Sequence, residues 1–207
     1  MAYLVLVRHG ESEWNAKGLW TGWTDVNLSE KGREEARAAG EKLKDIHFDI
    51  AYTSILARAK QTWEEMQKVI GQTDLPTTAN QALNERDYGD MTGKNKWEIK
   101  QQVGEEEFQK LRRSWDYPPP HGESLKMVYE RVLPYYEKEV LPQLKIGKNI
   151  IIAAHGNSLR ALIKYLENIS DSDIPNLEMA TGGVYVYQID GEGKVTSKQI
   201  RATGDAH

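Results

Sequence analysis

The hydrophobic and polar positions of the chain follow two kinds of pattern, one typical of buried strands and one typical of amphipathic helices. Continuous apolar runs at residues 3–7 and 149–154 predict strands buried on both faces of a parallel sheet. A shorter strand is expected at residues 48–52. Near the end of the chain, alternation over residues 184–189 and 195–200, joined by a glycine-containing turn, predicts a closing hairpin.

Helical periodicity separates these strands. Ser29 is a good N-cap for a helix that runs to about Lys44. A second amphipathic helix is predicted from Ile55 to Ile70 and should end at Gly71. A further helix is expected over residues 158–168, directly after the second buried strand.

The middle of the chain has a different character. Residues 73–96 are polar and irregular, and a helical hairpin is predicted over residues 97–115. Three consecutive prolines at 118–120 break the chain. A long helix then begins near Leu125, and Pro134 either kinks it or divides it in two.

The order of these elements predicts an α/β fold. We expect a three-layer sandwich with a mostly parallel central sheet, one antiparallel edge strand and a helical insert at about residues 91–122. The length of 207 residues fits a single domain, 1–207.

Composition narrows the functional classes. The chain has 27 basic and 31 acidic residues, a formal net charge of −4, which argues against a nucleic-acid surface. No apolar run reaches the ~20 residues of a transmembrane helix, so no membrane partner is expected. There is no cysteine, which excludes disulfides, a thiolate nucleophile and a cysteine metal site. The first strand begins almost at once without a leader, and we expect a cytoplasmic protein.

Two histidine-glycine pairs carry the candidate chemistry. His9-Gly10 and His155-Gly156 each follow a predicted parallel strand, at the sheet edge where α/β proteins bind ligands. Glycine allows close backbone approach, and a following helix offers N–H groups to an anion. We therefore expect a phosphate site.

His9 is the candidate nucleophile. An imidazole attacks phosphorus when one ring nitrogen is unprotonated and the other is fixed as a donor. Arg8 and Arg58, the latter also just past a predicted strand, could surround the phosphate oxygens. Glu85 could protonate a departing alcohol oxygen.

Other interpretations of these residues remain open. A single histidine after a strand is structural about three times in four, and repetition of the pair reduces that alternative without removing it. The cluster of Trp14, Trp20 and Trp23 is better explained by loop packing than by a carbohydrate platform. Asp45 and His47 have the spacing of a metal-ligand pair but lack partners, so no metal is expected.

The residues resemble a known family. Leu6-Val-Arg-His-Gly-Glu-Ser-Glu-Trp-Asn15 is similar to the signature of the histidine phosphatase superfamily, and most similar to its cofactor-dependent phosphoglycerate mutases. Further stretches agree in order, at residues 21–29, 52–54, 83–86, 88–89, 112–113 and 151–160. The likeness covers about residues 3–203.

The resemblance implies an isomerase of glycolysis and gluconeogenesis. It would interconvert 3-phosphoglycerate and 2-phosphoglycerate after 2,3-bisphosphoglycerate primes His9, with no metal. Arg8, Arg58 and His155 would form the phosphate pocket, and Glu85 would be the proton donor and acceptor. The implied binding residues are Asn15, Thr21, Gly22, Tyr88, Lys96, Arg112, Arg113, Gly156 and Asn157, with Thr181 and Gly182 lining the same cleft.

Three departures from the family pattern bear on activity. Asp87 stands where a histidine is common, and its charge is expected to act near the ligand. Only residues 114–122 separate Arg113 from Glu123, and the chain ends at His207 without a longer lysine-containing tail. We therefore expect a monomer or small homo-oligomer. A histidine phosphatase acting on small phosphomonoesters remains an alternative, as does a regulatory protein that binds phosphometabolites without turnover.

Overall fold

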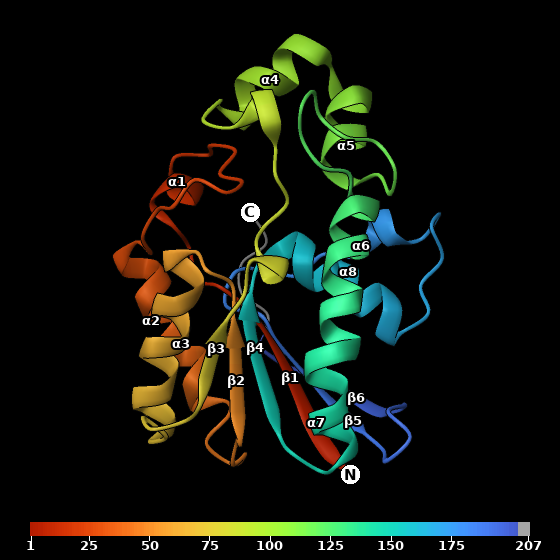
Figure 1. The fold of residues 1–207 in the computed structure, drawn as a ribbon. Helices are drawn as coiled ribbons and strands as arrows, with labels where there is room; N and C mark the ends of the chain where they lie inside the picture. The colour runs from red at the N-terminus through yellow and green to blue at the C-terminus, as the bar shows by residue number, and fades with distance from the viewer. Residues whose placement is uncertain (203–207) are drawn as a thin grey trace.

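A computed structural model describes residues 1–202, and its central element is a six-stranded sheet (Figure 1). The strands are β1 (Ala2–Arg8), β2 (Ile50–Thr53), β3 (Thr77–Ala79), β4 (Ile150–Ala154), β5 (Val184–Ile189) and β6 (Val195–Ala202). Their order across the sheet is β3-β2-β4-β1-β5-β6. All pairings from β3 to β1 are parallel, whereas β5 is antiparallel to β1 and β6 to β5. The predicted mostly parallel sheet is confirmed, with a hairpin supplying the antiparallel edge.

Helices cover both faces of this sheet. They are α2 (Glu30–Glu41), α3 (Ala57–Ile70), α6 (Leu125–Tyr135), α7 (Leu141–Lys145) and α8 (Gly156–Leu166). In Figure 1, α2 and α3 lie on one side of the sheet and α6 and α8 on the other. The predicted three-layer sandwich is therefore confirmed.

The first strand shows why the layers form. Leu4 and Leu6 belong to the hydrophobic cluster shared with α6, α7 and α8, and Val5 and Val7 to the cluster shared with α2 and α3. All four side chains are fully buried. Because side chains alternate between faces, this apolar run contributes to two cores at once, at roughly 1.5–3 kcal/mol for each buried side chain.

The local signals that bound the helices act as predicted. The Ser29 side chain accepts a hydrogen bond from the Gly32 N–H and caps α2. Gly71 ends α3 in the left-handed conformation, with φ of 77°, where glycine carries no steric penalty. The helix after β4 begins at Gly156, two residues before the predicted start, which places its first N–H groups beside His155.

The insert is a helical hairpin, as predicted. It consists of α4 (Lys96–Val103) and α5 (Glu105–Arg113), which Figure 1 shows beyond the carboxyl ends of the parallel strands. The region before it is less irregular than expected. It contains the exposed edge strand β3 and two 3₁₀ turns, Gln81–Leu83 and Gly89–Met91. Three exposed residues are too few to form a hydrophobic pattern, so β3 could not be predicted from the sequence.

The remaining elements are short. Pro134 lies inside α6, and the chain stays helical beyond it through a π-helical turn, Tyr136–Val140, into α7. The helix is therefore not divided at the proline. Two further short elements are α1 (Glu13–Ala16) and a 3₁₀ turn at Ile174–Asn176.

Within residues 1–202, no helix combines the length and the apolar character that crossing a membrane requires. The expectation about the end of the chain concerns residues 203–207, which lie outside the described residues.

Candidate active site

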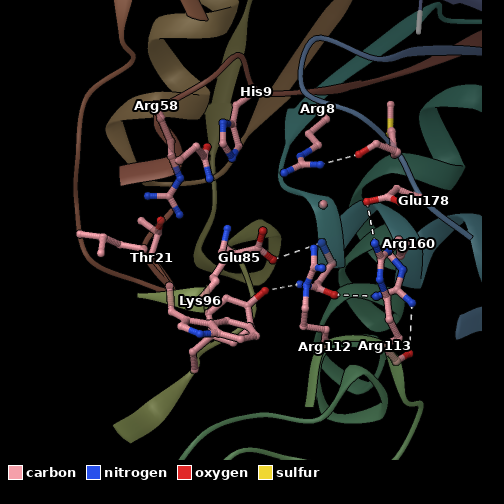
Figure 2. Close-up of a pocket in the computed structure, with 17 residues that line it drawn as sticks. Arg8, His9, Thr21, Arg58, Glu85, Lys96, Arg112, Arg113, Arg160 and Glu178 are labelled. Atoms are coloured by element: carbon pink, nitrogen blue, oxygen red, sulfur yellow. Dashed lines mark hydrogen bonds and ion pairs between the residues drawn. The ribbon is translucent and has the colours of Figure 1, made fainter. Parts of the chain in front are cut away.

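A cleft lies where β1 and β4 end, below the helical insert (Figure 2). It is lined by Arg8, His9, Asn15, Leu19, Trp20, Thr21, Arg58, Glu85, Tyr88, Lys96, Arg112, Arg113, Gly156, Asn157, Arg160, Glu178 and Met179. We call Arg8, His9 and Arg58 the strand end of the cleft, and Lys96, Arg112 and Arg113 its insert end.

His9 follows β1 directly and is held in one orientation. Its Nδ1 lies 2.6 Å from the Gly10 carbonyl oxygen, so Nδ1–H donates and Nε2 keeps its lone pair. A Cβ on residue 10 would stand 2.1 Å from the Gly32 carbonyl oxygen, which is why this position requires glycine. The close packing of residue 10 against α2 fixes the carbonyl that orients the ring.

The electrostatics keep His9 neutral. Burial is the main cause that lowers its pKa well below the usual value, and the charges of Arg58 and Arg8 lower it further. The side chain is 2% exposed. A neutral imidazole with a free Nε2 is the form that attacks phosphorus.

His155 lies behind His9 and does not line the cleft. The two ring centroids are 4.9 Å apart, and His155 Nε2 lies 2.6 Å from the Ser54 hydroxyl oxygen. Burial, then Arg58 and His9, lowers the pKa of His155 as well. Its Nδ1 is buried without a hydrogen-bond partner. If the Ser54 hydroxyl donates to Nε2, the single proton of the neutral ring sits on this buried Nδ1.

Backbone carbonyls fix the two arginines of the strand end. Arg58 donates from Nη1 to the Thr24 carbonyl (2.9 Å) and from Nη2 to the Gly22 carbonyl (2.7 Å). Arg8 donates to the Met179 carbonyl at 2.6 Å. Burial lowers the pKa of Arg58 to about 10, so it remains a cation at neutral pH. These guanidinium groups are positioned before any ligand arrives.

Glu85 is held by two backbone amides. Its Oε1 accepts hydrogen bonds from the N–H groups of Arg86 (2.7 Å) and Asn157 (3.1 Å), the latter in the first turn of α8. The residue is 8% exposed and lines the cleft. Both bonds use one carboxylate oxygen, so the other, Oε2, is not engaged by either amide.

The insert end presents cations from the helical hairpin. Lys96 is the first residue of α4, while Arg112 and Arg113 are in the last turn of α5. Burial, followed by the charges of Arg112 and Arg8, lowers the pKa of Lys96 to about 8. The Arg112 guanidinium lies over the Phe108 ring, 5.4 Å from its centroid.

Sequence reasoning missed two polar residues of the cleft. Arg160 on α8 donates to the Asn157 side chain at 2.9 Å, and burial lowers its pKa to about 10. Its i, i+3 spacing from Asn157 on a helix was a usable signal. Glu178 binds Arg113 at 2.6 Å, but it lies in a loop without any motif. Figure 2 shows both near Arg112 and Arg113.

Several expected site residues do not line the cleft. Gly22 contacts the site through its carbonyl, which accepts a hydrogen bond from Arg58. Thr181 and Gly182 do not line the cleft either. The Gly182 N–H instead donates to the Arg8 carbonyl at 3.1 Å. Asp87 does not line the cleft either, because its carboxylate accepts the Gly89 N–H at 2.9 Å. All the other expected residues except His155 line the cleft.

The site favours an anion over a metal ion. His9, Glu85 and His155 offer ligand atoms within 4.8 Å of one another, a geometry that could hold a cation. However, six lysine or arginine side chains line the cleft against two carboxylates, Glu85 and Glu178. This excess positive charge attracts a ligand with more than one negative group.

Comparisons with known proteins agree with this chemistry. A model of the histidine phosphatase superfamily (branch 1) matches residues 4–200. A 2,3-bisphosphoglycerate-dependent phosphoglycerate mutase from Parvibaculum lavamentivorans is 52% identical over 206 residues, covering 99% of this chain and 98% of that protein.

Solved structures resemble the fold over the whole chain. Bacillus stearothermophilus YhfR has a TM-score of 0.83 at 28% identity, with coverage of 100% of this chain and 98% of that one. A phosphoglycerate mutase from Bacillus anthracis has a TM-score of 0.75 at 26% identity, covering 99% of this chain and 93% of that one.

Proposed function

We propose, given that this chain belongs to the histidine phosphatase superfamily, that it is a 2,3-bisphosphoglycerate-dependent phosphoglycerate mutase. It would interconvert 3-phosphoglycerate and 2-phosphoglycerate through a phosphohistidine at His9. The observation that carries the proposal is one cleft with a neutral histidine at its strand end and further cations at its insert end. Substrates with a phosphate and a second anionic group match that layout.

The residues at the strand end would perform the transfer. His9 Nε2 attacks phosphorus, and the bond between phosphorus and the substrate oxygen breaks. Arg8 and Arg58 stabilise the charge on the transferring oxygens, and Glu85 gives its proton to the departing oxygen. In the return step Glu85 takes a proton from the attacking hydroxyl as the phosphoryl group leaves His9.

The insert end would hold the rest of the substrate. Lys96, Arg112 and Arg113 provide donors for a carboxylate or a second phosphate. The same cleft is lined by Asn15, Thr21, Tyr88, Gly156 and Asn157. Cations at both ends also suit 2,3-bisphosphoglycerate, which supplies the phosphoryl group that primes His9. The insert must exclude water during turnover, because hydrolysis of the phosphohistidine would make the enzyme a phosphatase.

We propose small phosphoglycerates as the only ligands, no metal requirement, and a monomer or small homo-oligomer in the cytoplasm. Two core clusters that share one sheet support a single domain over residues 1–207, with the insert at about 91–122.

The test follows 3-phosphoglycerate by phosphorus NMR, with catalytic 2,3-bisphosphoglycerate and EDTA present. Growth of the 2-phosphoglycerate signal is the expected result. Accumulation of inorganic phosphate instead would identify a histidine phosphatase using the same nucleophile. Tight binding of 2,3-bisphosphoglycerate without phosphohistidine or turnover would indicate a regulatory binding protein.

A further inference from the structure

Arg131 lies on α6, outside the cleft lining, yet it contacts the loop that carries Glu85. Its Nη1 donates to the carbonyls of Ala82 (2.7 Å) and Asn84 (3.1 Å), and its Nη2 to the carbonyl of Glu85 (2.9 Å). Three carbonyls within four residues thus converge on one guanidinium group. Ala82 belongs to the 3₁₀ turn Gln81–Leu83 and the other two residues follow it, so Arg131 fixes the path of the chain as it leaves that turn.

The remaining donors of Arg131 bind a carboxylate. Nε donates to Glu123 Oε1 (2.8 Å) and Nη2 to Glu123 Oε2 (2.9 Å). Together with the three carbonyls, these bonds use all five N–H groups that a guanidinium possesses. Glu123 Oε2 also accepts the Asp87 N–H at 2.9 Å, which ties the far side of the loop to the same pair.

The contact reaches the Glu85 carboxylate through a single peptide unit. The Glu85 carbonyl and the Arg86 N–H belong to the same planar, trans peptide and point in opposite directions. Arg131 and the Trp23 indole N–H (2.6 Å) hold the carbonyl side. The N–H on the other side donates to Glu85 Oε1 at 2.7 Å. The plane of that peptide therefore sets where the carboxylate stands.

We propose that Arg131 is a positioning residue for proton transfer by Glu85, acting through the peptide between residues 85 and 86. The inference rests on the proposed function, in which Glu85 protonates the departing oxygen. Only a planar fork with five donors can hold the three carbonyls and the carboxylate together, so lysine cannot replace it. Trp23 supports the same carbonyl, and its ring lies 5.6 Å from the guanidinium carbon of Arg131.

The test compares leaving groups in an Arg131→Lys enzyme. An alkyl oxygen leaves poorly and needs the proton of Glu85, whereas p-nitrophenolate leaves without one. Phosphohistidine formation from 2,3-bisphosphoglycerate should slow by about 10- to 100-fold, because small misplacements of a catalytic group cost that much. Formation from p-nitrophenyl phosphate should change by less than about threefold, since His9, Arg8 and Arg58 are untouched.

Two further variants sharpen the result. Arg131→Lys added to Glu85→Gln should cause no further loss with 2,3-bisphosphoglycerate, because the two residues act in one step. Trp23→Phe removes one donor to the Glu85 carbonyl and should show the same dependence on leaving group, with a smaller loss. It keeps the proposal testable if Arg131→Lys does not fold.

The control is Arg201→Lys, which also removes a guanidinium bonded to a carbonyl and a carboxylate, those of Lys42 and Asp45. Arg201 is 16% exposed, comparable with 20% for Arg131. Equal losses with both phosphate donors, or additive losses with Glu85→Gln, would overturn the proposal. Wild-type protein that forms phosphohistidine without isomerising 3-phosphoglycerate would instead refute the mutase function, and the comparison of donors would still stand.

Discussion

The two ends of the cleft are built differently although both collect positive charge. At the strand end, Arg58 is 1% exposed, and two backbone carbonyls fix its guanidinium group. At the insert end, the Arg113 side chain is 20% exposed and forms an ion pair with the Glu178 side chain, itself 38% exposed. The hairpin that carries it packs through a small cluster of three buried residues, Trp20, Ile99 and Phe108.

The difference separates chemistry from recognition. Donors that are fixed before binding stabilise a transition state without reorganisation, which suits the transfer step at His9. Donors on a weakly anchored hairpin can adjust to a ligand that presents different groups in turn. Changes at the strand end should therefore lower kcat, and changes at the insert end should raise KM.

The largest effect is expected for His9→Ala. Loss of the candidate nucleophile should abolish phosphohistidine and lower turnover by about 10⁵-fold or more. Intact-protein mass spectrometry without acid, together with the NMR assay, measures both. His121→Ala is the control, because that side chain is 85% exposed and does not line the cleft. If the His9→Ala enzyme still turned over, the strand end would not be the place of phosphoryl transfer.

Arg58→Lys should have the second-largest effect on turnover. A lysine cannot bond the Thr24 and Gly22 carbonyls while presenting a fork to the phosphate. We expect kcat to fall about 100-fold, since hydrogen bonds to charged groups contribute about 1.5–3 kcal/mol each. Steady-state kinetics with 3-phosphoglycerate would check this. A change confined to KM would mean that the strand end only binds.

Arg112→Ala probes the other end. Removing this cation should raise KM for 3-phosphoglycerate about 10- to 100-fold, as for a lost charged contact, and change kcat by less than about threefold. The matched control is Lys110→Ala on the exposed side of the same helix, where the lysine pairs with Glu106. A loss mainly in kcat would contradict the division between the two ends.

The same division explains how much the sequence could predict. The strand end follows from continuous apolar runs that stop at His9 and His155, because parallel strands bring their carboxyl ends to one edge. The hairpin and Arg112 were also predicted, but the contacts of Glu178 were not. That residue lies far from Arg113 in the chain and in no motif. Its loop is held by side chains of two strands, since Arg8 donates to the Met179 carbonyl and Tyr185 to the Glu178 carbonyl. Likewise, Asp87 does not line the cleft, because its carboxylate accepts a hydrogen bond from the Gly89 N–H.

Lys96 makes the insert end sensitive to pH. With a pKa of about 8 in the free enzyme, Lys96 is half protonated near pH 8 and loses its charge progressively as the pH rises further. An anionic ligand binds the charged form, so KM should rise above pH 8, by at most about tenfold per pH unit. Lys96→Arg keeps the charge, and its KM should stay flat from pH 7 to 9. An equally steep rise in that variant would assign the titration to another group.

The smallest effect is expected for Glu178→Gln. The Glu178 carboxylate occupies one donor of Arg113 and repels an anion that enters the insert end. Both effects oppose binding, and both are weakened by partial exposure to water. KM for 3-phosphoglycerate should therefore fall by about two- to fivefold with kcat unchanged, because a partly exposed ion pair contributes about 1 kcal/mol or less. Glu106→Gln on the exposed face of α5 is the control and should leave KM unchanged. A higher KM in Glu178→Gln would mean that the carboxylate positions Arg113 for the substrate, and the insert end would then be fixed in advance like the strand end.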